Sequence, residues 1–338
     1  MNIKIKNIEK IKQDISLSKS IVITTHRTPD GDAIGSSLGL YNLLIKQGQN
    51  TTVISPDQYP DYLHWLKGDD KVVIFSEDKD RAIQIINKAD MIFCLDYNDI
   101  SRIENLEPYI KKSAAKKILI DHHPDPGDFA DHIISDTTVS STAELVYEFI
   151  LLAGIEELID KDIAECLFMG IMTDTGAFTY NSFVPRTYEV IAKLLGYGID
   201  KNKIYSNVYD NFSEDRMKLL GYCLDKKMVV IHKYRAAYIS ITKEELKKYN
   251  YKIGDSEGFV NYPLSVKGIL FSAIFIEKDD HVKTSFRSKG SFKVNKFAED
   301  HFDGGGHDNA AGGESPLPLD AAIKKFTSLL PRYADDLK

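Results

Sequence analysis

The sequence predicts an α/β protein of two domains, with a doubly wound, mainly parallel sheet first and a smaller α+β domain after it. Three observations carry this prediction. The 338 residues exceed what one ordinary core accommodates. Over the first half, short β-rich segments alternate with helical ones, which is typical of parallel sheets. From about residue 227 onward, strand-like segments instead follow one another directly.

The first half contains five short runs dominated by apolar or β-branched residues, each separated from the next by a helical segment or a polar loop. Strands are expected at 21–25, 51–55, 71–75, 91–95 and 116–120, and helices at 33–48, 81–89, 141–154 and 161–174. The helix at 33–48 ends at Gly48, a usual stop signal.

The second half changes pattern. Residues 185–226 look helical throughout, and a new helix starts near Ser213. A hairpin is expected at 227–242, paired strands at 267–278 and 281–288, and a closing helix at 319–335. We therefore predict a first domain over 1–190, a helical linker over 191–215 and a second domain over 216–338.

Composition narrows the class of protein. With 43% hydrophobic and 28% charged residues, the chain reads as a soluble globular protein. Its net charge of −7 argues against a protein that coats nucleic acid. No apolar run approaches the roughly 20 residues that span a bilayer, and the first residues lack a signal peptide's apolar stretch. We therefore expect a cytoplasmic protein with no membrane partner, whose three separated cysteines are small buried hydrophobes.

Acidic and imidazole side chains follow three of the predicted strands at the point where each strand ends. Those side chains are His26, Asp30 and Asp32 after the first strand, Asp96 after 91–95, and Asp121, His122 and His123 after 116–120. One such aspartate is usually a turn residue or helix cap. Because ligands bind beyond the carboxyl ends of parallel strands, several at one edge predict a functional site.

The residue types at this edge favour divalent cations. Carboxylate oxygens and imidazole nitrogens suit hard or borderline metals, and two ions about 4 Å apart need a carboxylate between them. Asp174 adds a further carboxylate late in an otherwise apolar helix, where an acid is rarely found unless paired or metal-bound.

At this point the motifs resemble a known family, the DHH phosphoesterase superfamily. HRTPDGDAIGS (26–36), Asp96 in LDYND (95–99), DHH (121–123) and Asp174 in MTDTGAF (172–178) are similar to its four motifs. GGGHDNAAGG (304–313) resembles the GGGH motif of the DHH-associated C-terminal domain. The likeness covers nearly the whole chain and is greatest to the bacterial nanoRNase/pAp phosphatase group.

The resemblance implies a two-metal phosphoesterase that acts on short oligoribonucleotides (nanoRNA) and/or 3′-phosphoadenosine 5′-phosphate, not on long duplexes, in a cleft between the domains. Two Mn²⁺ ions are expected, although Mg²⁺ or Co²⁺ also suits these ligands. A pApA or cyclic-di-AMP phosphodiesterase, an exopolyphosphatase or pyrophosphatase-like hydrolase, and a non-catalytic nucleotide sensor stay open as alternatives. A homodimer is also left open.

The resemblance also implies roles for single residues. The metal ligands would be His26 and Asp30 for a first cation, Asp32, His122 and Asp174 for a second, and Asp96 between the two. His123 would contact the substrate or protonate the leaving group, and Asp121 would orient a ligand. The substrate-binding candidates are Arg287, His307, Gly304, Gly305, Gly306, Ser288, Arg102 and Asn181. Phe259 either stacks on a base or belongs to the core.

Overall fold

The computed structural model describes residues 8–179 and 184–338, and its contacts divide the chain into two units between Asn211 and Phe212. The division falls inside the segment 191–215 that the sequence analysis assigns to a linker. The helices at 185–195 and 201–209 lie in the first unit.

The first unit is built on a sheet of six strands in the order β3-β2-β1-β4-β5-β6, with every neighbouring pair parallel. Its strands are β1 (Ile21–Thr24), β2 (Thr51–Ser55), β3 (Val73–Ile74), β4 (Met91–Leu95), β5 (Lys116–Asp121) and β6 (His132–Ser135). This is the strand order of doubly wound folds. The predicted class of the first domain is therefore confirmed.

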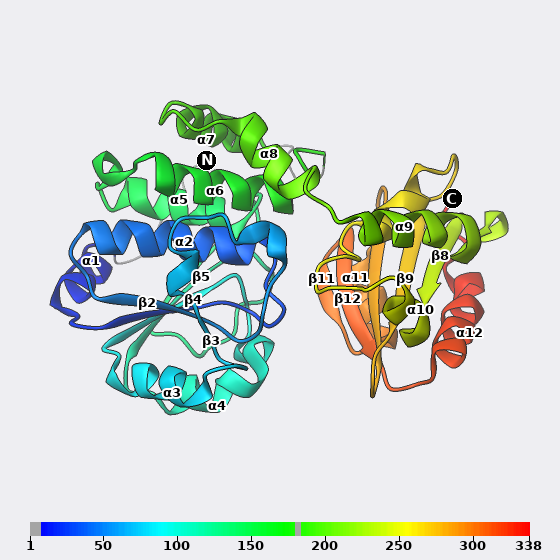
Figure 1. Ribbon diagram of the computed structural model, residues 1–338, viewed down its shortest axis with the longest axis horizontal. Helices are drawn as coiled ribbons and strands as arrows, with labels where there is room; N and C mark the ends of the chain where they lie inside the picture. Colours follow the sequence, from blue (N-terminus) through cyan, green and yellow to red (C-terminus); the bar gives the residue numbers. More distant parts are fainter. Residues whose placement is uncertain (1–7, 180–183) are drawn as a thin grey trace. The chain divides into compact units, whose positions relative to one another are not determined.

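Helices cover both faces of this sheet. They are α1 (Ile8–Leu17), α2 (Gly31–Lys46), α3 (Lys79–Lys88), α4 (Glu107–Lys112), α5 (Thr142–Leu152), α6 (Lys161–Asp174), α7 (Pro185–Leu195) and α8 (Lys201–Tyr209). Figure 1 shows α2, α5 and α6 on one face and α3 and α4 on the other. Successive side chains of β1 therefore point to opposite faces of the sheet. Ile21 and Ile23 belong to the hydrophobic core on one face, and Val22 belongs to the core on the other face.

Helices α2 and α6 pack with almost no space between their backbones. A Cβ atom added at Gly35 would lie 2.7 Å from the Cys166 carbonyl oxygen and 2.9 Å from Gly170 Cα. A Cβ added at Gly170 would lie 3.1 Å from Asp32 Oδ1. This close contact brings the acidic start of α2 next to the end of α6.

Replacing Gly35 by Ala is expected to destabilise the protein, although alanine is the better helix former. The added methyl group meets backbone that cannot move aside, which costs about 1–3 kcal/mol of unfolding free energy. Gly221→Ala is the control, because Gly221 also lies in a helix but has nothing within 4 Å of an added Cβ. That variant should gain up to about 1 kcal/mol. Urea unfolding measures both changes, and equal stability of Gly35→Ala and wild type would contradict the close packing.

The second unit is a mixed sheet in the order β11-β12-β10-β9-β8-β7, with β8 and β9 parallel and the other pairs antiparallel. Its strands are β7 (Met228–Ile231), β8 (Ala236–Ile241), β9 (Phe271–Glu277), β10 (Val282–Ser288), β11 (Gly305–His307) and β12 (Ala310–Ser315). Its helices are α9 (Glu214–Tyr222), α10 (Lys243–Lys248), α11 (Val294–His301) and α12 (Leu319–Leu329). The expected α+β domain is thus confirmed.

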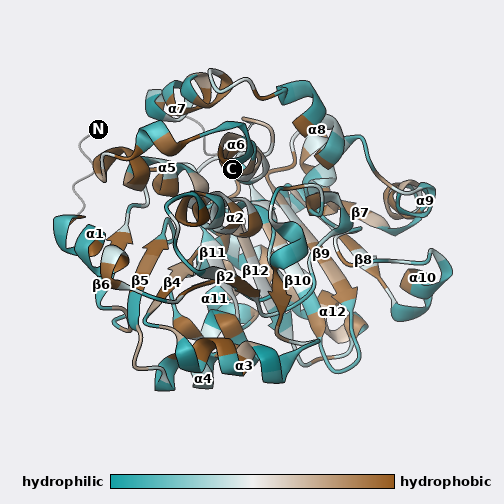
Figure 2. Ribbon diagram, turned by 60° about the vertical axis from the view of Figure 1, so that its left-hand side comes forward, coloured by the Kyte–Doolittle hydropathy of each residue, from teal (hydrophilic) through white to brown (hydrophobic). Residues whose placement is uncertain are grey.

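Hydropathy follows this architecture. Figure 2 shows strands β4 and β9 mainly in hydrophobic colours, whereas α10 is mainly hydrophilic. Phe259 is fully buried among aliphatic side chains of the second unit, so it belongs to the core and has no face to offer a base. The three cysteines are buried and reduced, as predicted. No helix in the described part of the chain is long and apolar enough to cross a bilayer.

Some elements differ from the sequence prediction. The strand expected at 71–75 is only Val73–Ile74, because Asp69–Lys71 forms a 3₁₀ turn. The closing helix ends at Leu329 and continues as a 3₁₀ turn that contains Pro331. Several elements were not predicted from the sequence: α1, α4, β6, α10, α11 and the β11–β12 hairpin.

Candidate metal centre

The predicted acidic and imidazole residues of the first unit meet at the carboxyl edge of its sheet. His26 follows β1 and Asp96 follows β4, and these two neighbouring strands are where the strand order reverses. Open α/β sheets bind their ligands at this switch point. Helix α2 begins directly after the β1 loop and carries Asp32, and α6 ends at Asp174.

A first cluster consists of His26, Asp30 and Asp96. His26 Nε2 lies 3.4 Å from Asp96 Oδ2 and 3.9 Å from Asp30 Oδ1. The other ring nitrogen, Nδ1, donates to the Arg27 carbonyl oxygen at 2.8 Å. This bond fixes the ring and leaves Nε2 as the nitrogen that can bind a metal.

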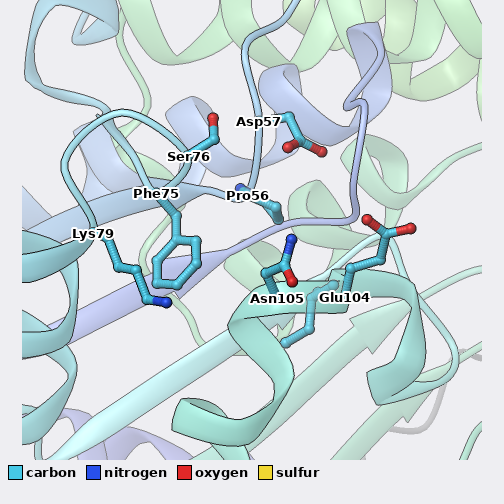
Figure 3. Close-up of a pocket in the computed structure, with 8 residues that line it drawn as sticks. Pro56, Asp57, Phe75, Ser76, Lys79, Glu104 and Asn105 are labelled. Atoms are coloured by element: carbon cyan, nitrogen blue, oxygen red, sulfur yellow. The ribbon is translucent and has the colours of Figure 1, made fainter. Parts of the chain in front are cut away.

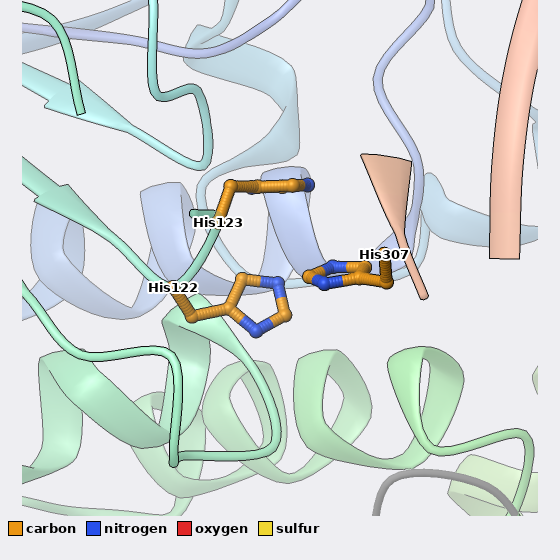
Figure 4. Close-up of side chains that lie close together, drawn as sticks. All are labelled: His122, His123 and His307. Atoms are coloured by element: carbon orange, nitrogen blue, oxygen red, sulfur yellow. The ribbon is translucent and has the colours of Figure 1, made fainter. Parts of the chain in front are cut away.

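A second cluster consists of Asp32, His122 and Asp174. His122 Nε2 lies 3.6 Å from Asp174 Oδ2 and 3.9 Å from Asp32 Oδ2. It also lies 3.8 Å from Asp96 Oδ1. Asp96 therefore presents one carboxylate oxygen to each cluster. Figure 4 shows His122 and His123 side by side on the loop that follows β5.

The two clusters fit divalent cations in both spacing and charge. Ligand atoms bound to one ion at about 2.1 Å lie about 3–4 Å apart, which matches the distances above. Burial, together with neighbouring carboxylates, raises the pKa of Asp32 and of Asp96 well above the usual range. Burial lowers the pKa of His26 and so favours its neutral, metal-binding form. Bound cations would offset the cost of these buried negative charges.

Backbone groups hold the carboxylates in place. Asp30 caps α2, with Oδ1 accepting from the Asp32 and Ala33 amides at 3.0 and 3.2 Å. Asp32 in turn accepts from the amides of Thr142 and Ala143, at 2.6 and 2.8 Å. The start of α5 is therefore part of the centre. The sequence predicts helix α5 but does not indicate that its first residues contact the site.

Asp121 and His123 form a pair beside the clusters, and His123 Nδ1 lies 3.8 Å from Asp96 Oδ1. His123 Nδ1 donates to Asp121 Oδ1 at 2.7 Å, and the His123 amide donates to Asp121 Oδ2 at 3.1 Å. Asp121 is fully buried and is held between β4 and β6 by the strand that carries it. Its carboxylate thus orients the ring of His123, which directs Nε2 away from Asp121.

The loop after β1 is also supported by residues from the segments that follow β2 and β4. The Arg27 amide donates to the Arg102 carbonyl oxygen at 2.8 Å, and the Thr28 amide donates to Asp57 Oδ2 at 3.1 Å. The Arg27 side chain pairs with Glu104. Asp57 and Glu104 also line a pocket of about 330 Å³ (Figure 3). Arg102, a predicted substrate residue, lies near the first cluster, where its charge helps to lower the pKa of His26 after burial, the largest cause.

The predicted substrate residues of the second unit lie on adjacent strands of its sheet. Arg287 on β10 pairs in register with Ala310 on β12, and Ala310 pairs with His307 on β11. Ser288 Oγ donates to the Phe292 carbonyl oxygen at 2.6 Å and accepts from Asn309 at 2.8 Å. Asn181 lies outside the described residues.

Two of the three glycines of GGGH, Gly304 and Gly306, are explained by the close approach of the chain at this hairpin. A Cβ added at Gly304 would lie 2.0 Å from the Gly312 carbonyl oxygen, and one at Gly306 would lie 2.6 Å from the Ala310 carbonyl oxygen. Gly306 also has a φ of +140°, which other residues rarely adopt. Gly305 has nothing within 4 Å of an added Cβ. The anion-binding roles predicted for Gly304, Gly305 and Gly306 stay predictions.

Comparison with protein families identifies the class of protein that this fold and site define. Residues 20–171 match the N-terminal domain of the DHH family, and residues 233–333 match the DHHA1 domain. The chain belongs to the DHH phosphoesterase superfamily, in the form that carries a DHHA1 domain, as its motifs predict. It is accordingly a hydrolase of phosphate esters.

Individual relatives agree with this assignment. The chain is 30% identical to the probable bifunctional oligoribonuclease and PAP phosphatase NrnA of Streptococcus mutans, covering 88% of this chain and 89% of that protein. It is 28% identical to the bifunctional oligoribonuclease and PAP phosphatase NrnA of Bacillus subtilis, over 88% and 90%. Among solved structures, an exopolyphosphatase-related protein from Bacteroides fragilis is similar with a TM-score of 0.94 and 43% identity, over 100% and 99%.

Proposed function

We propose that this protein is a two-metal phosphoesterase that hydrolyses short oligoribonucleotides and/or 3′-phosphoadenosine 5′-phosphate. The observation that supports two ions is the position of Asp96, with Oδ2 at 3.4 Å from His26 and Oδ1 at 3.8 Å from His122. A carboxylate that serves two clusters is what a two-ion site requires. The relatives named as oligoribonucleases and PAP phosphatases support the proposed substrate class.

In this proposal each of the two clusters supplies the ligands of one cation. His26 and Asp30 would hold the first cation, Asp32, His122 and Asp174 would hold the second, and Asp96 would serve both. Such ions lower the pKa of water and neutralise charge on a phosphoryl group. Mn²⁺ suits the mixed oxygen and nitrogen ligands, as do Mg²⁺ and Co²⁺.

The chain's own residues then complete the reaction. His123, oriented by Asp121 through the 2.7 Å bond at Nδ1, donates a proton from Nε2 to the leaving alkoxide or a hydrogen bond to a phosphoryl oxygen. Arg102, placed near the first cluster, would contact a phosphate oxygen. Arg287 and His307 would bind the remainder of the substrate.

An exopolyphosphatase is the second candidate, because the Bacteroides fragilis structure with 43% identity is described as exopolyphosphatase-related. That activity needs the same two ions but no recognition of a nucleoside. The substrates themselves therefore distinguish the two proposals.

A turnover panel with added Mn²⁺ tests the proposed function. The substrates are 3′-phosphoadenosine 5′-phosphate, RNAs of two, five and twenty nucleotides, pApA, cyclic-di-AMP, and inorganic polyphosphate. We expect the dinucleotide, the pentanucleotide and 3′-phosphoadenosine 5′-phosphate to be hydrolysed faster than the longest RNA. Cleavage of polyphosphate alone would favour the second candidate, and preference for the longest RNA or for cyclic-di-AMP would contradict the proposed substrate class.

A further inference from the structure

Two buried carboxylates of the clusters, Asp32 and Asp96, are held by the same residue, Thr142, the first residue of α5. The Thr142 amide donates to Asp32 Oδ2 at 2.6 Å, and its hydroxyl donates to Asp96 Oδ1 at 2.9 Å. Thr142 is fully buried, and Asp32 and Asp96 are 1% and 2% exposed. One residue, through its backbone amide and its hydroxyl, therefore connects Asp32 of the second cluster to Asp96, which faces both clusters.

The local sequence explains why the start of α5 is available for this. Ser141 is the N-cap, and its hydroxyl accepts from the Glu144 amide at 3.1 Å. The amides of Thr142 and Ala143, which have no partner within the helix, then point at Asp32. A helix N-terminus also attracts negative charge, so these two amides offset part of the cost of burying the Asp32 carboxylate.

The helix start is itself anchored by a buried acid. Glu144 Oε2 accepts from the Ser140 amide at 3.0 Å and from the Thr187 hydroxyl at 2.8 Å. Glu144 is 1% exposed and Thr187, on α7, is fully buried. These hydrogen bonds fix the position of Thr142 at the start of α5, so its hydroxyl can orient a neighbouring side chain.

The carboxylate of Asp96 needs a neighbouring group that fixes its orientation. Its backbone φ of +64° sets where the side chain starts, but the last torsion of an aspartate is broad. The backbone alone does not decide which oxygen faces which cluster. The Thr142 hydroxyl engages Oδ1 on the side of His122, which leaves Oδ2 facing His26.

We propose that Thr142 is a positioning residue that couples the two cation sites by holding Asp96 in its bridging orientation. The inference rests on the proposed function, since it requires two cations. Thr142 touches neither the substrate nor the reacting atoms in this proposal. It acts through Asp96 and, by its amide, through Asp32.

The test is Thr142→Val, which keeps the shape of the side chain and the amide bond to Asp32 but removes the hydroxyl. Thr142→Ser keeps the hydroxyl. Thr187→Val is the matched control, because it removes another fully buried threonine hydroxyl of the same network that contacts no predicted metal ligand. Titration with Mn²⁺ alone, followed by electron paramagnetic resonance, measures the number of bound ions, their affinities and the magnetic coupling of a bridged pair.

We expect wild type, Thr142→Ser and Thr187→Val to bind two coupled ions. Thr142→Val should bind the second ion about 10- to 100-fold more weakly and lose the coupled signal. Two coupled ions of wild-type affinity in Thr142→Val would overturn the inference. If that variant does not fold, Thr142→Ala carries the same expectation and the same contrary outcome. A wild-type protein that binds fewer than two ions would instead contradict the proposed function, and the inference with it.

Discussion

Replacing Asp96 by Asn is expected to lower phosphoesterase activity by roughly three orders of magnitude or more while the first unit stays folded. Asp96 presents an oxygen to each cluster, so in the proposed two-metal arrangement its loss would affect both cations together. Asparagine is a suitable replacement, because it tolerates the left-handed backbone that Asp96 adopts, with φ +64°. An effect of this variant therefore reports on charge and not on backbone strain.

The same substitution should not destabilise the metal-free protein. Burial, followed by the charges of Asp30, Asp121 and Asp174, raises the pKa of Asp96 well above its usual range. When folding raises the pKa of an acid, the folded protein loses stability as the pH rises from the acid's pKa in the unfolded state to its pKa in the folded state. Above the folded-state pKa the full cost remains. Asn removes this cost, so at pH 8 without metal the variant should unfold at the wild-type temperature or higher.

Asp99→Asn provides the matched control for Asp96→Asn. Asp99 lies in the same short segment, but it is exposed and its side chain caps a 3₁₀ turn by accepting from the Ser101 amide at 2.9 Å. Asparagine caps equally well, so this variant should keep its activity. Mn²⁺-dependent phosphate release and calorimetric unfolding measure both variants. Near-normal turnover of Asp96→Asn would contradict the two-metal arrangement.

The sheet edge was predictable because its signals are local. A short run of apolar or β-branched residues predicts each strand, and a polar residue directly after the run must lie at the carboxyl edge. His26, Asp96 and His122 were found in this way, and their proximity follows from parallel strand order alone. The hairpin at 305–315 was not found, because a run of glycines reads as a loop and only the close approach of the two strands explains it.

The supports of the centre were less predictable because they are tertiary. Thr142 looks like an ordinary first residue of a helix, and nothing in its neighbourhood indicates a bond to Asp96, 46 residues away. The position of Asp57 against the Thr28 amide is of the same kind. Asp121 was predicted to orient a ligand. The sequence alone does not indicate that its carboxylate accepts hydrogen bonds from His123, two residues away.

The second large effect is expected for His123, and it should depend on the leaving group. His123→Asn should lower kcat on a dinucleotide by about 10²- to 10⁴-fold if the ring protonates the leaving alkoxide. A p-nitrophenyl ester of a nucleotide leaves without such help, so the same variant should lose far less activity on it. Asp121→Asn should show the same pattern more weakly, because the ring loses the partner at 2.7 Å that orients it.

A second His–Asp pair in the same unit makes the control for this prediction. His132 on β6 lies 3.4 Å from Asp14 on α1, and neither belongs to the two clusters. His132→Asn should leave both substrates unaffected, and Mn²⁺ binding should be unchanged in His123→Asn because His123 Nδ1 is already engaged by Asp121. Equal losses on the dinucleotide and the p-nitrophenyl ester would assign His123 to phosphate binding instead. Loss of Mn²⁺ from His123→Asn would make it a metal ligand, since a ring that serves only the substrate has no effect on the cations.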